Sequence, residues 1–290
     1  MTTDLTIVIV NYKVKELVMK LLDSVYAQVR GISFEVYLID NASDDWIVVE
    51  VAKRFPDVNV IANDRNLGFA TACNQGIRRA AGRHVLLLNP DTELIEDAPS
   101  AMVREADANP DVGVIGCRVL NADRSLQRSV LGFPTVRSQV AVMLKLHHLA
   151  PWLPCLKRYF LPDFDYSRTQ DVDQVIGAAF MITRSALDKV GLMDEKYFIW
   201  FEEVDYCRSV RDAGLKIRYL SDTSIIHHGG QSFGQLLALP KQRLWNRSLG
   251  RYMRKHGGIA RWLIVESLMP LSLVLAWIVG ILGIKRRRYA

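Results

Sequence analysis

Three carboxylates stand close together in the stretch FIWFEEVDYCRSVRDAG. Glu202, Glu203 and Asp205 open a helical pattern, directly after a run of aromatic residues that includes Trp200. The positive end of a helix dipole favours negative charge, so a solvated acidic first turn is one interpretation. Aromatic walls, however, desolvate a carboxylate, raise its basicity and offer stacking faces for a sugar ring. The pattern therefore favours a general base beside a sugar site.

A further carboxylate follows the leucine run in LLLNPDTEL. Asn89 and Asp91 bring an amide oxygen and a carboxylate to the carboxyl edge of a predicted buried strand. Such oxygens suit Mg²⁺ or Mn²⁺, which normally share their ligand shell with substrate phosphates and water. A nucleotide diphosphate fits this arrangement, because the metal would neutralise the charge of the departing group. A turn that caps the next segment is the alternative for this tripeptide.

Two more motifs are candidates for phosphate contacts. In IIHHGGQSFG, His227 or His228 ends a predicted strand before a Gly-Gly turn, which lets the chain fold over a ligand. In NDRNLGFATACNQG, a loop with Asn66 and Gly68 opens a helix whose amino end could cradle a phosphate or ribose. A surface histidine is the ordinary alternative for the first motif, and the second is weak by itself.

Alternating strands and helices must position these residues. Apolar runs predict strands at 5–12, 34–41, 58–63, 84–89 and 112–120, with helical patterns between them. Strands that are apolar on both faces and separated by helices indicate a mostly parallel sheet covered on both sides. Ligands bind such α/β sheets at the carboxyl ends of the strands. Polar residues at three of these ends, Asn11, Asp40 and Asn89, favour a ligand crevice over simple helix caps.

The rest of the chain divides into a variable middle and an apolar end. Residues 121–174 are rich in loops, carry a helical pattern at 137–149, and are expected to form a lid or acceptor region. Residues 236–290 are expected to be a basic linker and membrane-associated helices. The apolar run at 267–284 would span about 27 Å as a helix, close to the about 30 Å of a bilayer core. Because Pro270 could break it, helices lying in one leaflet are favoured over a full span.

The charge and cysteine content of the chain indicate its class of binding partner and its cellular compartment. The 290 residues carry a formal net charge of +6, and basic clusters lie at 243–261 and 285–288, on both sides of the apolar run. This placement indicates an anionic membrane surface rather than nucleic acid. Four scattered cysteines without a CxxC pair indicate buried thiols in a reducing compartment. The amino end reads as a strand rather than a signal peptide, so the folded body is expected at the cytoplasmic face of the cell membrane.

In their order along the chain, these motifs resemble glycosyltransferase family 2, the inverting enzymes of the GT-A fold, and especially its rhamnosyltransferase-like branch. The matching segments are VIVNY, LIDNASDD, NLGFATACNQG, LLLNPDT, VIGAAFMITRSALDKVGLMDE, FEEVDYCRSVRDAG and HHGGQS. The resemblance covers about residues 4–235 and implies a GT-A domain over 1–235.

The resemblance implies a donor site at the strand ends. The positions that match the family's donor-binding segments are Asn11, Asp40, Asn66, Gly68, Asn74, Asn89 and Asp91. Asp40 would contact the nucleotide base, and Asn74 would help to line the donor ribose and phosphate. Asp91 matches the metal-binding aspartate of the family's DXD motif, and His227 matches the histidine that completes the metal or diphosphate site. Asn89 stands where many members have the first aspartate, so metal binding would rest more on Asp91.

The resemblance also implies where the general base lies. Glu203 falls where the family usually has the aspartate of a Glu-Asp pair. Because glutamate is one methylene longer, Glu202 or Asp205 could share the role. Gly177 and Ala178 look like the tight turn beneath the acceptor and donor sugar. In the implied single displacement, the base acts on the acceptor hydroxyl and a divalent metal, Mg²⁺ or Mn²⁺, acts on the leaving diphosphate.

The expected function is therefore an inverting, metal-dependent transfer of a sugar from a nucleotide-diphosphate donor. Rhamnose from its dTDP donor is the first expectation and UDP-sugars come next. The apolar tail indicates a lipid-linked saccharide acceptor in envelope polysaccharide or glycolipid synthesis. A sugar nucleotidyltransferase is an alternative, but it would want a glycine-rich loop after the first strand, and NYKVKELV has no glycine. A non-catalytic, membrane-bound sugar-nucleotide scaffold is the other, and it predicts disrupted carboxylates.

Overall fold

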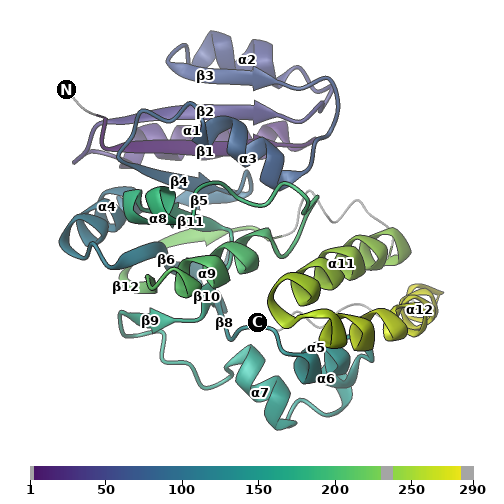
Figure 1. Cartoon of the computed structure of the whole chain (residues 1–290). Coiled ribbons are helices and arrows are strands. Elements are labelled where there is room, and N and C mark those ends of the chain that lie inside the picture. Colours follow the sequence, from purple (N-terminus) through teal and green to yellow (C-terminus); the bar gives the residue numbers. More distant parts are fainter. Residues whose placement is uncertain (1–2, 230–237, 282–290) are drawn as a thin grey trace.

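The computed structural model describes residues 3–229 and 238–281, and in these residues ten strands form one mixed sheet (Figure 1). The strand order is β3-β2-β1-β4-β11-β6-β12-β5, with β7 paired to β6 and β9 to β12. A separate pair joins β8 and β10. The strands are β1 (Leu5–Asn11), β2 (Phe34–Asp40), β3 (Val58–Ala62), β4 (His84–Leu88), β5 (Thr92–Leu94), β6 (Val112–Leu120), β7 (Leu126–Gln127), β8 (Val130–Leu131), β9 (Gln170–Val172), β10 (Gln174–Val175), β11 (Ala179–Ile182) and β12 (Lys216–His227).

Helices cover both faces of this sheet. They are α1 (Lys15–Gln28), α2 (Ile47–Arg54), α3 (Phe69–Ile77), α4 (Ala98–Ala108), α5 (Val136–Met143), α6 (Leu146–Leu149), α7 (Pro154–Phe160), α8 (Arg184–Lys189), α9 (Glu202–Asp212), α11 (Ala238–Tyr252), the π-helical turn η1 (Met253–Gly257) and α12 (Ile259–Ile281). Apolar residues of α1, α2 and α4 pack on one face, and those of α3, α8 and α9 on the other. All of β1 is buried between these layers. The predicted mostly parallel sheet with two covered faces is confirmed.

β5, β7, β9 and β11 pair antiparallel with their neighbours, and β11 is the one of these four that lies in the middle of the sheet. β11 lies between β4 and β6 and is antiparallel to β4, with Ala179 opposite Leu88. The residues that precede β11 therefore reach the carboxyl end of β4, where the Asn89 N–H donates to the Ala178 carbonyl over 3.0 Å. A short apolar strand carries no signal for its direction, because pairing with the open edges of its neighbours decides it.

The predicted helix at 137–149 is two helices. α5 ends at Met143 and α6 begins at Leu146, because Lys145 between them takes a left-handed φ of 58°. The Lys145 ammonium donates to the Gln242 side-chain carbonyl on α11 over 2.9 Å. A tertiary contact thus accompanies a break that helical periodicity did not indicate.

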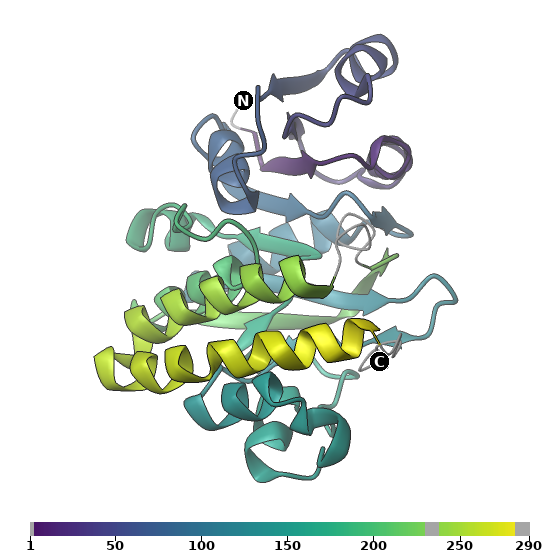
Figure 2. The same cartoon turned by 90° about the vertical axis from the view of Figure 1, so that its right-hand side faces the viewer.

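The segment expected to be a basic linker is helical. α11 and η1 place Leu249 and Tyr252 in a small third core with Tyr197 and Phe201, which lie just before α9. This core attaches the carboxyl-terminal helices to the segment that carries the acidic residues. In Figure 2, α11 and α12 lie side by side across the front of the sheet.

The predicted break at Pro270 is wrong, since α12 continues through this proline. Pro270 leaves the Glu266 carbonyl, four residues earlier, without its usual donor. A separate polar contact with α11 lies just after the proline. The Asn246 amide donates to the Ser272 hydroxyl over 2.8 Å, and that hydroxyl donates to the Met269 carbonyl over 2.9 Å. By length and composition, residues 259–278 of α12 are the one described helix that could cross a membrane. The expected basic cluster at 285–288 lies outside the described residues.

Candidate active site

The carboxyl ends of β1 and β2 bring two predicted site residues together. Asn11 and Asp40 are partners in the parallel register, and the Asn11 amide donates to an Asp40 carboxylate oxygen over 2.9 Å. The same amide lies 2.8 Å from the Ser43 hydroxyl. Both loops that leave these strands contain left-handed residues that are not glycine, including Lys13 and Ala42. Such backbone strain clusters at functional sites, where surrounding contacts hold it in place.

The Asn66–Gly68 loop docks on the segment that precedes α9. Gly68 has a φ of +86°, and an added Cβ would lie only 2.6 Å from the Phe198 carbonyl oxygen. The same carbonyl accepts the Phe69 N–H over 2.8 Å. The Asn66 side chain accepts the Gly68 N–H over 2.9 Å and lies 3.3 Å from the Asn41 amide. The loop is therefore shaped by contacts on both sides, and one of them comes from Asn41, directly after β2.

Asn74 connects α3 to the segment around Met193 by hydrogen bonds. Its side chain is fully buried, accepts the Met193 N–H over 3.0 Å and donates to the Met193 carbonyl over 2.9 Å. It also donates to a Glu195 carboxylate oxygen over 3.0 Å. These bonds engage both polar atoms of the amide. They argue against the predicted contact with the donor ribose and phosphate, and make Asn74 a support for the loop.

Asp91 and His227 face each other at the end of β4 and β12. The Asp91 carboxylate is buried, and one of its oxygens lies 3.3 Å from Nε2 of His227. Nδ1 of His227 lies 2.7 Å from the Gln127 side-chain carbonyl, which can only accept, so Nδ1 carries a proton. A bond of this kind on the far nitrogen orients a metal-ligating histidine. The sequence did not predict a role for Gln127, on β7. Only its contact with His227 in the folded chain shows that it belongs to this site.

These two side chains fit a divalent cation that shares its ligands with a substrate. Nε2 of His227 and an oxygen of Asp91 lie 3.3 Å apart, and imidazole nitrogen and carboxylate oxygen are both ligand atoms for divalent metals. In the described residues, no group of three or more His, Cys, Asp or Glu side chains could hold a metal by itself. His228 turns instead toward Glu93, at 3.5 Å. Substrate phosphates and water would have to complete the shell of a hard cation.

Glu202 and Glu203 bury two carboxyl groups at the start of α9. In the described part of the chain, each has one oxygen, Oε2, that is buried without a hydrogen-bond partner. Burial raises the pKa of Glu202 well above its usual range, and the neighbouring Glu203 raises it further. Burial also raises the pKa of Glu203. An unpaired carboxylate oxygen of raised basicity is suited to accept a proton from a substrate.

A strained backbone turn directly precedes Glu202 and Glu203. Trp200 and Phe201, directly before α9, have left-handed φ values of 60° and 69°. Residues other than glycine take this region at a cost of about 1 kcal/mol or more each. α11 holds the strained turn, because the Ser248 hydroxyl donates to the Ile199 carbonyl over 2.7 Å and Phe201 packs on Trp245. The predicted sugar contact of Trp200 stays a prediction.

The start of β11 connects the Asp91 turn to Glu203. A Cβ added at Gly177 would lie 4.0 Å from Cγ of Glu203, and the adjacent Ala178 accepts from the N–H of Asn89. The predicted turn and the predicted base are therefore neighbours.

Asp205 has a different environment from Glu203. One of its oxygens accepts from Tyr197 over 3.1 Å and lies 2.7 Å from Nε2 of His256, and the other accepts from Lys255 over 2.7 Å. Both oxygens are thus engaged, and the side chain is only 3% exposed. These bonds tie α9 to η1 and argue against Asp205 as a shared base. The sequence could not predict this network, because Lys255 and His256 lie about fifty residues after Asp205.

The chain is similar to known proteins over most of its length. Residues 6–191 match the family described as glycosyl transferase family 2. An N-acetylglucosaminyl-diphospho-decaprenol L-rhamnosyltransferase of Mycobacterium tuberculosis is 28% identical over 213 residues, which are 69% of this chain and 68% of that protein. The low-salt glycan biosynthesis hexosyltransferase Agl10 of Haloferax volcanii is 27% identical over 235 residues, 79% of this chain and 68% of that protein.

Solved structures show the same fold. A mannosyltransferase of Pyrobaculum calidifontis in complex with GDP-Man and Mn²⁺ aligns with a TM-score of 0.58 at 16% identity, over 99% of this chain and 77% of that chain. GalNAc-T7 with UDP, GalNAc and Mn²⁺ aligns with a TM-score of 0.57 at 17% identity, over 78% of this chain and 44% of that chain. Both bind nucleotides or sugars with Mn²⁺ in their own structures.

Proposed function

The chain belongs to glycosyl transferase family 2, and from that premise we propose that it is an inverting, metal-dependent glycosyltransferase acting on a lipid-linked saccharide. The observation that carries the proposal is the contrast at the site. Glu202 and Glu203 each keep an unpaired buried oxygen, whereas both oxygens of Asp205 are bonded. Of these two glutamates, Glu203 is the one whose side chain lies beside Gly177, just before β11.

Glu203 acts as the base on the acceptor hydroxyl. Its raised pKa makes its carboxylate a stronger proton acceptor than an exposed glutamate. Proton abstraction lets the hydroxyl oxygen attack the anomeric carbon of the donor in a single displacement, which inverts that carbon. Base catalysis of this kind contributes about 10² to 10⁴ in rate. Burial by the strained Trp200–Phe201 turn excludes water that would compete with the acceptor.

Asp91 and His227 would hold a divalent cation, Mg²⁺ or Mn²⁺, together with the donor diphosphate. When bound, this cation supplies charge neutralisation for the leaving nucleoside diphosphate. Gln127 keeps the His227 ring oriented toward Asp91. The backbone of Asp91 also anchors the turn, since the Asp91 carbonyl accepts the His228 N–H over 2.8 Å.

The nucleotide would lie over the ends of β1 and β2. The paired Asn11 and Asp40 side chains are suited to the base, and the docked Asn66–Gly68 loop is suited to the ribose and phosphate. Rhamnose as the donor sugar is supported by the name of the M. tuberculosis relative. For the nucleotide we propose dTDP, with UDP-sugars as the next choice. That name, with its diphospho-decaprenol, also supports a lipid-linked acceptor.

The membrane is the proposed place of action. α12 is apolar along residues 259–278, and only 17% of its most apolar window is buried in the protein. Exposed apolar side chains on a long helix indicate contact with lipid. Lipid-linked acceptors in envelope polysaccharide or glycolipid synthesis reach an enzyme at this surface. We place the catalytic domain on the cytoplasmic face, where nucleotide sugars are made.

Calorimetric titration of the detergent-solubilised protein tests the donor site. UDP, dTDP and GDP are titrated with and without Mn²⁺ into the wild type, Asp91→Ala and the control Glu93→Ala. We expect metal-dependent binding of one nucleotide, its loss in Asp91→Ala and its retention in the control, because Glu93 turns toward His228. Absence of nucleotide binding by the wild type under every condition would overturn the donor site.

A further inference from the structure

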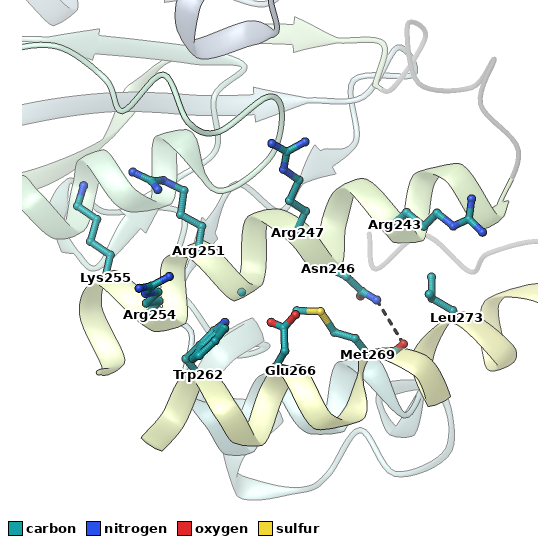
Figure 3. Close-up of a pocket in the computed structure, with 11 residues that line it drawn as sticks. Arg243, Asn246, Arg247, Arg251, Arg254, Lys255, Trp262, Glu266, Met269 and Leu273 are labelled. Atoms are coloured by element: carbon teal, nitrogen blue, oxygen red, sulfur yellow. Dashed lines mark hydrogen bonds between the residues drawn. The ribbon is translucent and has the colours of Figure 1, made fainter. Parts of the chain in front are cut away.

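A basic pocket lies between α11 and α12, away from the strand ends. Its volume is about 610 Å³. Five cationic side chains of α11 and η1 line it: Arg243, Arg247, Arg251, Arg254 and Lys255. Figure 3 shows these cations on one wall and Trp262, Glu266 and Met269 of α12 on the other. Glu266 is the one acidic residue of this lining.

The positive charge of this pocket is only partly compensated. Arg251 pairs with Asp194, and Lys255 lies 2.7 Å from an Asp205 oxygen. Among the described residues, no carboxylate comes within 4.0 Å of the charged nitrogens of Arg243, Arg247 or Arg254. Arginines four positions apart on a helix face repel one another, which destabilises the helix. An anion between them would relieve this repulsion and accept their hydrogen bonds.

The charged pocket adjoins an exposed apolar surface. Trp262, Met269 and Leu273 form the α12 wall of the pocket. Other faces of the same helix leave large apolar side chains in solvent, including Leu263, Leu271, Val274 and Trp277, each about half exposed. A helix built for the core of a soluble domain would bury these residues. The combination suits an amphiphile, with an anionic group for the arginines and a hydrocarbon chain for α12.

The basic wall also continues toward the donor loop. Arg247 and Arg251 line a second pocket of about 380 Å³ together with Leu67 and Phe198. Leu67 precedes Gly68, and Phe198 carries the carbonyl on which that loop docks. α11 thus contributes both to the basic pocket and to the wall of a pocket beside the donor loop. A headgroup held by α11 would therefore lie near the loop that the proposed donor site uses.

We propose that the pocket between α11 and α12 binds the phosphate or diphosphate group of the lipid that carries the acceptor saccharide. The hydrocarbon chain of this lipid lies along the exposed apolar face of α12. The saccharide then extends past Arg247 and Arg251 toward Glu203. This inference rests on the proposed lipid-linked acceptor, and it adds the residues that recognise the lipid.

Vesicle co-flotation of the full chain tests the pocket. The probes are phosphatidylcholine vesicles, the same vesicles with polyprenyl diphosphate, and vesicles with phosphatidylglycerol at matched surface charge. The test variant is Arg243→Gln, Arg247→Gln and Arg254→Gln combined. The control combines Lys53→Gln, Arg104→Gln and Lys189→Gln, which remove the same charge from exposed positions on α2, α4 and α8.

We expect the wild type and the control to bind the polyprenyl diphosphate vesicles more tightly than either other probe. Each cation near a lipid phosphate contributes roughly fivefold in affinity, so the test variant should bind them about a hundredfold more weakly. Equal losses in the test variant and the control would overturn the pocket. Equal binding of the wild type to both charged vesicles would overturn the carrier lipid in favour of bulk phospholipid.

Nucleotide titration of the same proteins separates this proposal from the proposed function. The test variant should bind the donor nucleotide as the wild type does, because its three substitutions leave Asp91 and His227 unchanged. In one outcome the wild type binds nucleotide, but the wild type and the test variant bind the polyprenyl diphosphate vesicles equally. The proposed lipid pocket is then wrong and the proposed donor site stands. If the wild type binds the lipid but no nucleotide, the proposed transferase function is wrong.

Discussion

Replacing Glu203 by glutamine separates the chemistry of this residue from its place in the fold. Glutamine keeps the shape of the side chain but cannot accept the acceptor's proton. We expect kcat to fall by about 10² to 10⁴, which corresponds to about 2.7 to 5.4 kcal/mol of barrier. Nucleotide binding should persist, because Asp91 and His227 are unchanged. Transfer of radiolabelled sugar from the donor, with calorimetry of nucleotide binding, measures both.

The same substitution should make the protein more stable at neutral pH. Oε2 of Glu203 is buried without a partner in the described part of the chain, and burial raises the pKa of this carboxyl group. Burial disfavours the charged form of the carboxyl group, and glutamine carries no charge, so the substitution removes the cost of ionising this group in the folded protein. Relief of about 1 kcal/mol raises Tm by roughly 2–4 °C in a domain of this size. Thermal unfolding followed by circular dichroism measures the shift.

The pH dependence of both effects has a defined sign. A raised pKa means that folded Glu203 holds a proton that the unfolded chain has released. The free energy of unfolding therefore rises as pH falls from neutral through the raised pKa toward the unfolded value of about 4.3. The stability advantage of Glu203→Gln should shrink over this range. Transfer by the wild type should fall over the same range, because the base becomes protonated.

Glu202→Gln is the matched control, since Glu202 shares the burial and the raised pKa. It should raise Tm as well, but lose much less activity than Glu203→Gln. Normal turnover by Glu203→Gln would refute the reasoning. An equal loss of turnover in both variants would show that the two carboxyl groups share the role of base. A lower Tm for Glu203→Gln would show a structural role instead.

Two further substitutions test the supports of the site. Gly68→Ala should lower Tm more than Gly214→Ala. Both glycines have a positive φ, but only at Gly68 would an added Cβ lie 2.6 Å from a carbonyl oxygen. Equal shifts of Tm in thermal unfolding would show that this close contact costs nothing. Gln127→Leu should weaken Mn²⁺-dependent nucleotide binding by about 10–100-fold, because the hydrogen bond that orients His227 is lost. Its Tm should change little. An unchanged nucleotide affinity in calorimetry would show that Gln127 has no role in the site.

The strands and their polar ends could be predicted because their signals are local. Apolar runs on both faces predicted β1, β2, β3, β4 and β6 with ends within two residues of those observed. Parallel strands end at one edge, so Asn11 and Asp40 could be expected to meet there, and they do. The acidic start of α9 was also readable, because three carboxylates follow an aromatic run.

The direction of β11, the break at Lys145 and the unbroken helix through Pro270 could not be predicted in this way. Each depends on a neighbour that is distant in sequence. β11 takes its direction from β4, Lys145 contacts Gln242, and the Ser272 hydroxyl beside Pro270 accepts from Asn246. Local propensity is a weak guide wherever such contacts supply the deciding free energy.

The sequence by itself determined which chemical groups the protein can use, and tertiary structure decided which of them remain available. Glu202, Glu203 and Asp205 are equivalent acids within one turn of sequence. Only the fold pairs Asp205 with Lys255 and His256 and leaves an oxygen of Glu203 unpaired. The physical reason is that burial and hydrogen bonding set the basicity of a carboxylate, and both come from residues far along the chain.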